Sequence, residues 1–261
     1  MPVWAEPASS SRNLINLATN GEIVNRVGRG CATHLSLARI HRPNNMRKGT
    51  RVILALDVTE ERKALAVAEA VRDQVDGIKV NWPLVLATSP DIITRLSKMA
   101  PVICDFKVAD IPNTNRLITE QAKRLGADGV IVHGFVGRDS VRAVVGSAGD
   151  MQVFVVTEMS HPGGKEFTAP VAEKLAAMAK EEGAAGIIAP ATRPGRVSEL
   201  RGIVGDLLIL SPGVGAQGGS AAEVIRNGAD YVIAGRSIYE DRDSRKAAER
   251  LAAEVRQALL R

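Results

Sequence analysis

The sequence has few cysteines, few aromatic residues and no long apolar run, and each shortage excludes a class of protein. Two cysteines, Cys31 and Cys104, are too few for a disulfide framework or a cysteine metal cluster, and they favour a reducing, cytoplasmic location. Aromatic residues make up only 3% of the 261 residues, which leaves few rings to stack on exposed nucleic-acid bases. No apolar run approaches the roughly 18 residues that cross a bilayer, and polar residues interrupt the N-terminus where a secretory signal needs an apolar core. We therefore expect a cytoplasmic protein that binds neither nucleic acid nor membrane.

The excess of positive charge lies in the first 50 residues. The formal net charge is +5 at pH 7; of the 34 Lys/Arg and 29 Asp/Glu residues, seven and two fall within residues 1–50, which leaves 27 of each sign afterwards. These first residues show no sustained helical or strand period, so we predict a basic, disordered N-terminal extension over residues 1–48. A start at Met46 and a transit peptide, which the Arg-containing, acid-poor composition allows, are the alternatives.

From Arg51 onward, short apolar runs alternate with helical patterns. Near-continuous apolar strands are typical of a parallel sheet that is covered on its outside. The predicted strands are 52–56, 77–80, one from 102 that ends before Pro112, 129–133, 153–157, 186–189, 207–210 and 231–234. The helices between them include one capped by Asn113 or Thr114 that runs to about 125. The last helix begins near Ser244 and has an apolar face of Ala247, Leu251, Val255 and Leu259.

A weak internal repeat indicates how these units are assembled. The segments V-D-G-I-K-V (75–80), G-A-D-G-V-I-V (126–132), G-A-A-G-I-I-A (183–189) and G-A-D-Y-V-I-A (228–234) share one plan: a helix end, often with a left-handed glycine, and then a buried strand. Eight such units in about 210 residues predict the α/β class, with a single (β/α)8 TIM barrel over residues 49–261. An open doubly wound sheet is the alternative, but no G-x-G-x-x-G follows the first strand.

Polar residues collect where the predicted strands end, which is the edge of a barrel where active sites are built. Asp105 and Lys107 share one face of their strand, and Cys104 and Phe106 share the other. With Asp110 and with Lys79 from the preceding strand, the two charges could form a network, or only a structural ion-pair lattice at the rim. A lysine held between two carboxylates stays protonated and is a fixed cation beside a fixed anion. The cation can stabilise a carbanion, and the anion can repel a carboxylate of the substrate.

Two glycine-rich segments follow the last two strands. They are S-P-G-V-G-A-Q-G-G (211–219) and A-G-R-S-I (234–238). Glycines let backbone N–H groups approach an anion, and Arg236 adds a bidentate donor. Barrels often bind phosphate at these two loops, so the sequence predicts a phosphorylated substrate. A flexible turn with a surface arginine is the alternative.

Residues 51–261 resemble the orotidine 5'-monophosphate decarboxylase family, most closely its shorter, archaeal-type form. D-x-K-x-x-D alone marks only a wider superfamily, whereas its continuation I-P-N-T and the glutamine of the phosphate loop are more specific. The motifs occur in the family's order: L-A-L-D (54–57), D-F-K-V-A-D-I-P-N-T (105–114), T-E-M-S-H-P-G (157–163), S-P-G-V-G-A-Q-G-G (211–219) and G-R-S-I-Y (235–239).

The resemblance implies decarboxylation of orotidine 5'-monophosphate to uridine 5'-monophosphate and CO2, the last step of de novo pyrimidine synthesis, with no cofactor and no metal. Lys107 would stabilise and protonate a carbanion at C6 of the pyrimidine, and Asp105 would lie near the departing carboxylate. Lys79 would bind Asp105 and the ribose. Asp110 and Thr114 would reach the ribose of the neighbouring subunit, so the resemblance also implies a homodimer.

The remaining substrate contacts implied by the resemblance come from other loops. A carboxylate would hold a ribose hydroxyl, a serine would contact the amide edge of the pyrimidine, a glutamine would reach towards the phosphate, and an arginine and a backbone amide would grip it. In this order they are Asp57, Ser160, Gln217, Arg236 and the Gly235 amide. Pro212 is a further substrate-binding residue. Three further residues are expected to be structural: His133 as a hydrogen-bonded rim histidine, His161 as a residue that shapes its loop, and Cys104 as a core residue.

Two other functions are weighed against this one. A magnesium-dependent decarboxylase or aldolase of the same superfamily, acting on a sugar phosphate, would carry a metal-binding carboxylate on the second strand, where this chain has Lys79. A non-catalytic nucleotide-binding barrel would be expected to lack Lys107 or its flanking carboxylates, and all are present.

Overall fold

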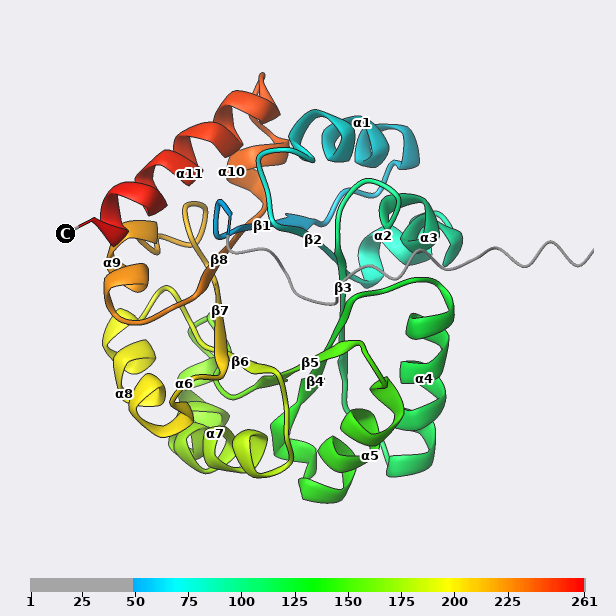
Figure 1. Ribbon diagram of the computed structural model, residues 1–261, viewed down its shortest axis with the longest axis vertical. Helices are drawn as coiled ribbons and strands as arrows, with labels where there is room; N and C mark the ends of the chain where they lie inside the picture. Colours follow the sequence, from blue (N-terminus) through cyan, green and yellow to red (C-terminus); the bar gives the residue numbers. More distant parts are fainter. Residues whose placement is uncertain (1–48, 261) are drawn as a thin grey trace, which may run out of the picture. The chain divides into compact units, whose positions relative to one another are not determined.

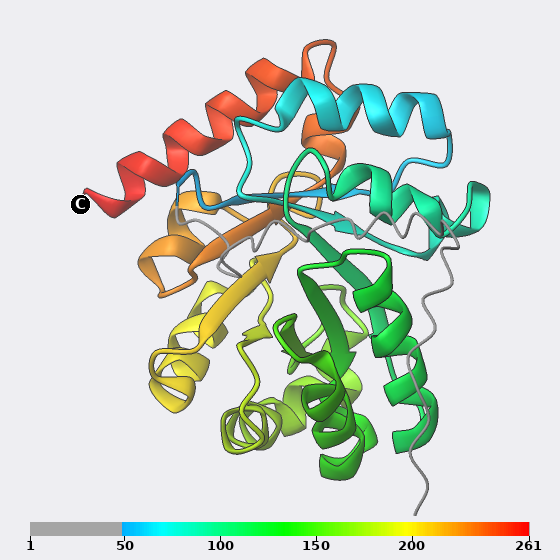
Figure 2. The same cartoon turned by 45° about the vertical axis from the view of Figure 1, so that its right-hand side comes forward.

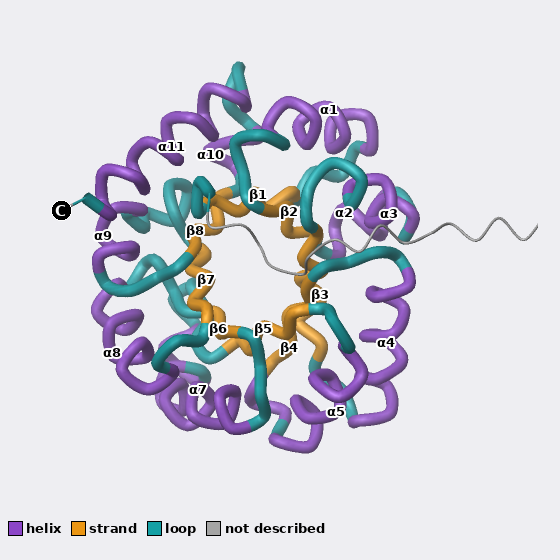
Figure 3. The backbone as a smooth tube through the Cα atoms, in the orientation of Figure 1, coloured by secondary structure: helices purple, strands orange, loops and turns teal. Residues whose placement is uncertain are grey.

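Eight parallel strands form a closed barrel, and helices surround it (Figures 1 and 3). This is seen in a computed structural model that describes residues 49–260; the extension predicted over residues 1–48 lies outside them. Each strand pairs with its neighbours in the sequence, and β8 pairs with β1. The predicted (β/α)8 barrel is therefore confirmed. The strands are β1 (Val52–Leu56), β2 (Gly77–Val80), β3 (Val102–Val108), β4 (Gly129–His133), β5 (Gln152–Val156), β6 (Gly186–Ile188), β7 (Leu208–Pro212) and β8 (Tyr231–Ala234).

Most strand limits agree with those expected, and the differences arise from pairing across the sheet. β7 begins one residue later than predicted and continues through Ser211 and Pro212, which pair with Val232 and Ile233 of β8. Pro212 ends the strand, and it has no N–H to donate to a neighbouring strand. β5 is shifted by one residue towards the N-terminus, and β6 is one residue shorter than expected.

Helices fill the outer ring, and α11 lies beside α1, where the chain closes the circle (Figures 1 and 2). No helix within residues 49–260 is long and apolar enough to cross a bilayer. The α-helices are α1 (Glu61–Val71), α2 (Trp82–Ala87), α3 (Asp91–Leu96), α4 (Pro112–Arg124), α5 (Arg138–Ala148), α6 (Gly164–Phe167), α7 (Ala172–Glu181), α8 (Pro194–Val204), α9 (Ala221–Arg226), α10 (Arg236–Tyr239) and α11 (Ser244–Leu259). Two short 3-10 helices are η1 (Gly134–Val136) and η2 (Ala169–Val171).

The expectation that Asn113 or Thr114 caps α4 is wrong. The helix begins at Pro112, which is preformed for a first helical position, so Asn113 and Thr114 lie inside the first turn. Asn115 secures the entry to the helix instead: its side chain accepts from the backbone N–H of Asp110 and donates to the Asp110 carbonyl. The apolar face of α11 is also shorter than expected, because Leu259, the last helical residue, is exposed.

Apolar side chains fill the barrel from both faces of its strands. One layer lies inside the barrel and includes Ile103, Ile131, Phe154 and Tyr231. A larger layer lies between the strands and the helices and includes Cys104, as predicted. Because alternate residues of a strand face opposite sides, this arrangement directs the polar side chains at the strand ends into the mouth of the barrel.

The internal repeat has a structural role at the amino ends of the strands. In three of the four repeats, an aspartate stands directly before β2, β4 or β8. Its carboxylate accepts a hydrogen bond from a backbone N–H near the start of the preceding strand, which is β1, β3 or β7. The pairs are Asp76 with the N–H of Arg51, Asp128 with that of Val102, and Asp230 with that of Ile209. The fourth repeat has Ala185 at this position. The glycines that end the preceding helices, Gly126, Gly183 and Gly228, have positive φ, as predicted.

Candidate active site

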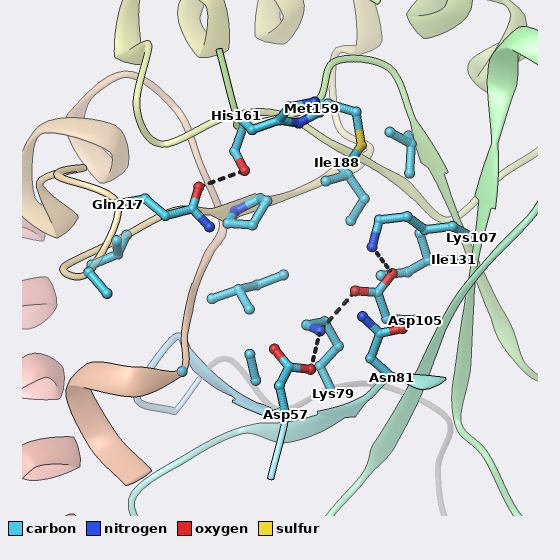
Figure 4. A pocket seen from close by; sticks show the side chains of 18 of the residues that line it. Asp57, Lys79, Asn81, Asp105, Lys107, Ile131, Met159, His161, Ile188 and Gln217 are labelled. Carbon is cyan, nitrogen blue, oxygen red and sulfur yellow. Dashed lines mark hydrogen bonds and ion pairs between the residues drawn. The ribbon is translucent and has the colours of Figure 1, made fainter. Parts of the chain in front are cut away.

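A pocket of about 380 Å³ opens at the carboxyl ends of the strands. Figure 4 shows Asp57, Lys79, Asp105 and Lys107 along one side of it, with Gln217 across from them. Apolar side chains of the inner layer, among them Ile131 and Ile188, lie between the two sides. The pocket therefore has a charged side, an apolar floor, and a second polar side formed by loops.

Asp105 is the centre of the charged side. Its two carboxylate oxygens lie 2.8 Å from Lys79 Nζ and 2.8 Å from Lys107 Nζ. Asp57 lies 3.7 Å from Lys79 on the other side. The expected lysine between two carboxylates is therefore Lys79, whereas Lys107 contacts one carboxylate within the chain. The side chain of Lys107 is 32% exposed and that of Asp105 is 7% exposed, so the ammonium of Lys107 is the more accessible group.

A bulge in β3 positions Lys107. Cys104 is paired with Val130 of β4 and Val108 with Val132, so three residues of β3 face one residue of β4. Lys107 has a φ of 44°, in the left-handed region that non-glycine residues seldom adopt. Bulges redirect side chains near active sites, and an outlier of this kind is a reason to look for function. Here Asp105 and Lys107 both line the pocket, as the alternation along the strand predicted.

The charges of the cluster fix its protonation. Burial alone would raise the pKa of Asp105, but Lys79 and Lys107 outweigh it and lower that pKa below the usual range. Burial alone would lower the pKa of Lys79, but Asp105 and Asp57 outweigh it and raise that pKa. Near neutral pH the pocket therefore presents an ionised Asp105 held by ammonium groups.

Asp110 and Thr114 are not among the described residues that line the pocket. The carboxylate of Asp110 instead accepts a hydrogen bond from the backbone N–H of Ile111 at 2.7 Å. The four-membered network expected from the sequence is thus wrong for a single chain, because Asp57 takes the fourth place. The expectation that Asp110 and Thr114 reach the site of a neighbouring subunit stays a prediction.

The loops after β5, β7 and β8 form the other side. Ser160, Pro212, Gln217, Gly235 and Arg236 all line the pocket. The hydroxyl of Ser160 donates to Gln217 Oε1 at 2.9 Å, which joins two of these loops. The β7 loop turns back on itself through three glycines with positive φ, Gly213, Gly215 and Gly218. The structure therefore brings together, on this side of the pocket, the five residues that the sequence analysis expected to bind the pyrimidine edge and the phosphate.

The loop that carries Ser160 is anchored through Glu158, a member of the T-E-M-S-H-P-G motif, by partners that sequence reasoning missed: Thr192, Arg193 and Arg196. Glu158 is fully buried, and its oxygens lie 2.7 Å from Arg193 Nε and 3.0 Å from Arg196 Nε. Arg193 also donates to the carbonyl of Met159, and Thr192 donates to that of Ser160. The signal in the sequence is the polar pair Thr192 and Arg193, which follows shortly after the predicted sixth strand.

His133 at the end of β4 differs from the expectation that it is hydrogen-bonded. Its Nδ1 is buried and has no hydrogen-bond partner among residues 49–260, and its ring contacts that of Phe135. Burial, reinforced by the Lys107 cation, lowers the pKa of His133 to about 4. His133 is therefore neutral near pH 7. Burial also raises the pKa of the Cys104 thiol to about 12, in agreement with its place in the core.

No cluster of three or more His, Cys, Asp or Glu side chains with the arrangement of a metal site occurs in the part of the chain that the structure describes.

A closed (β/α)8 barrel with a charged cluster after β1 to β3 and a glycine-rich loop after β7 defines the class: a barrel enzyme with its site at the carboxyl ends of the strands. The sequence model of the orotidine 5'-phosphate decarboxylase / HUMPS family matches residues 50–251, and the chain belongs to this family.

Several relatives carry the first of these two names. The chain is 59% identical to the orotidine 5'-phosphate decarboxylase of Methanosarcina mazei over 217 residues, which are 82% of this chain and 99% of the relative. It is 52% identical to that of Thermococcus kodakarensis over 209 residues, 79% of this chain and 97% of the relative. The structure resembles orotidine 5'-monophosphate decarboxylase from Methanocaldococcus jannaschii complexed with the inhibitor BMP, with a TM-score of 0.75 and 45% identity over 78% of this chain and 97% of that one.

Proposed function

We propose that this chain converts orotidine 5'-monophosphate to uridine 5'-monophosphate and CO2, the last step of de novo pyrimidine synthesis, without a cofactor. The observation that carries the proposal is the cluster in which Asp105 lies 2.8 Å from both Lys79 and Lys107, at one end of a pocket whose other end has Arg236 and a glycine-rich loop. The family description includes a second name, but the relatives at 59% and 52% identity are decarboxylases by name.

The reaction needs electrostatic stabilisation more than covalent chemistry. When the bond from C6 to the carboxylate breaks, CO2 leaves and the electron pair stays on C6, in the plane of the ring, where the π system cannot delocalise it. A fixed cation beside that carbon is then the main source of stabilisation. The side chain of Lys107 is 32% exposed and that of Lys79 only 7%, so Lys107 is the ammonium that stabilises the carbanion and gives C6 a proton, which it regains from solvent.

Asp105 has two roles in this scheme. Its ionised carboxylate faces the carboxylate of the substrate, and the repulsion between them is relieved as CO2 departs. It also holds Lys107 in place through the 2.8 Å contact. Lys79 keeps Asp105 ionised and, together with Asp57, binds the ribose. The side chain of Asp57 is 36% exposed, so its carboxylate can accept from a hydroxyl while one of its oxygens faces Lys79 Nζ at 3.7 Å.

The opposite side of the pocket binds the rest of the nucleotide. Arg236 and the Gly235 amide grip the phosphate, with Pro212 and Gln217 beside it, and Ser160 contacts the amide edge of the pyrimidine. The Ser160–Gln217 hydrogen bond couples the two ends. Binding energy from the phosphate therefore helps to close the loops around the pyrimidine, where the chemistry takes place.

The assembly and location are part of the proposal. We infer a homodimer in which Asp110 and Thr114 of each chain complete the ribose site of its partner; the resemblance to the family and the exposure of Asp110 support this. A cytoplasmic location suits a metabolic enzyme with a buried free thiol at Cys104.

The test is turnover of orotidine 5'-monophosphate, followed by pyrimidine absorbance, on chelator-treated protein and on a Lys107→Ala variant. Activity that survives chelation and is lost in Lys107→Ala supports the proposal. Nucleotide binding without turnover would indicate a non-catalytic barrel. A requirement for magnesium with a sugar phosphate, and no activity on the nucleotide, would indicate the other branch of the superfamily. Sedimentation of the wild type tests the dimer.

A further inference from the structure

Trp82 contacts the strand that carries Lys107, although it lies outside the pocket. It is the first residue of α2, directly after Asn81, whose side chain accepts from the Trp82 backbone N–H at 2.7 Å. The indole ring stacks on Phe106, with ring centroids 4.3 Å apart and an interplanar angle of 22°. The indole N–H donates to the backbone carbonyl of Phe106 at 3.1 Å. Trp82 thus holds both the side chain and the backbone of the residue before Lys107.

That backbone is where ordinary strand pairing is interrupted. The register of β3 with β2 ends at Val80 and Cys104, and its register with β4 is broken between Cys104 and Val108. The segment 105–107 therefore depends on other contacts to keep its shape. The left-handed φ of 44° at Lys107 is unfavourable for a residue with a side chain and persists only if its surroundings impose it.

Because a peptide group is planar, fixing the Phe106 carbonyl also fixes the N–H of Lys107 and the direction of its Cα. We propose that Trp82 is a positioning residue for Lys107: its indole holds the Phe106–Lys107 peptide in the bulged conformation that directs the ammonium to Asp105 and the reacting carbon. This inference rests on the proposed function for its kinetic consequence and on geometry alone for its structural one.

A purely structural role for Trp82 is the competing explanation, because Phe106, on which its ring stacks, packs against the outer core. Trp82→Phe separates the two, since it keeps a stacked ring and removes the N–H donor. Misplacing a catalytic group by about 1 Å can cost about 100-fold, so kcat is expected to fall about 10- to 100-fold while KM stays within about twofold. Exchange of the C6 proton of uridine 5'-monophosphate in D2O, which reports proton transfer from Lys107, should fall by the same factor.

Leu86→Ala is the matched control, because Leu86 lies on the same helix and is 78% exposed. It should leave kcat and the exchange rate unchanged. A folded Trp82→Phe variant with the kcat of the wild type overturns the inference, and so does one in which a higher KM accounts for the whole effect. If Trp82→Phe does not fold, Phe106→Leu replaces it: that variant loses the stacking but keeps the bond from the indole N–H to the carbonyl of residue 106, so kcat should stay within about twofold of the wild type, and a fall of about 10-fold or more would overturn the inference.

A crystal structure of Trp82→Phe decides the geometry independently of any activity. We expect Lys107 to leave the left-handed region and its ammonium to move out of hydrogen-bond distance of Asp105. Lys107 found at positive φ and still bonded to Asp105 would overturn the inference. A wild type without turnover of orotidine 5'-monophosphate would instead refute the proposed function, and this crystal structure would then be the sole test of the positioning role.

Discussion

Lys79 Nζ lies 2.8 Å from Asp105 Oδ2, and each of the two side chains is only 7% exposed. Each group stabilises the charge of its partner in a place where burial would otherwise disfavour it. Removing one member of such a pair leaves an uncompensated charge, which is more costly than never having the pair.

Lys79→Met should therefore lower the free energy of unfolding by about 3 kcal/mol, because Asp57 and Asp105 lose their shared cation. Urea unfolding at pH 7.5 measures this. Lys98→Met is the control: Lys98 is exposed, and its replacement should change the free energy by no more than about 0.5 kcal/mol. Equal stability of Lys79→Met and the wild type would show that the pair contributes nothing net.

His133 makes stability depend on pH in a predictable direction. Burial, with the Lys107 cation, lowers its pKa from 6.5 to about 4 in the folded chain. Between these values the unfolded chain binds more protons than the folded one, so stability is full above pH 6.5 and declines as the pH falls towards 4. The slope from this residue is at most about 1.4 kcal/mol per pH unit.

His133→Gln should remove that part of the slope. The measurement is urea unfolding of both proteins at pH 7.5, 6 and 5, with His161→Gln as a control for the loss of an exposed histidine. The two curves of stability against pH should converge at the acid end if His133→Gln costs a small amount at pH 7.5. Parallel curves would mean that His133 is not buried in the neutral form.

The sequence was sufficient for the fold and for most of the pocket because both depend on local periodicity. Alternation along one strand places Asp105 and Lys107 on one face, and the order of strands in a barrel brings Lys79 beside them. The bulge at Lys107 could not be predicted from the sequence, because it depends on the register of β3 against β4. Arg193 was missed for a similar reason, since its partner Glu158 is 35 residues away. Asp110 lies outside the pocket of the single chain, and its expected contact with the site of a neighbouring subunit stays a prediction.

The aspartate before β4 should stabilise the barrel without affecting catalysis. Asp128 accepts from the Val102 N–H at 2.9 Å, at the end of the barrel opposite the pocket. Asp128→Ala leaves that buried N–H without its acceptor, which should cost about 1–3 kcal/mol in unfolding free energy while kcat is unchanged. Thermal and urea unfolding measure the loss, and Asp150→Ala, at an exposed position, is the control. Loss of activity at full stability would contradict this role.

Ser160 and Gln217 should act as one unit, because the serine hydroxyl donates to Gln217 Oε1 at 2.9 Å across two loops. Ser160→Ala and Gln217→Ala each break the same bond, so the second substitution should cost less once the first is present. Contacting residues show interaction energies of about 0.5–3 kcal/mol, and the cycle should give a value in this range from kcat/KM for orotidine 5'-monophosphate. The pair Asp57→Ala and Gln217→Ala is the control, because these residues face each other across the pocket (Figure 4) and should be nearly additive. Additive effects for Ser160 and Gln217 would mean that the bond does not persist when the nucleotide is bound, and that the two loops recognise its two ends independently.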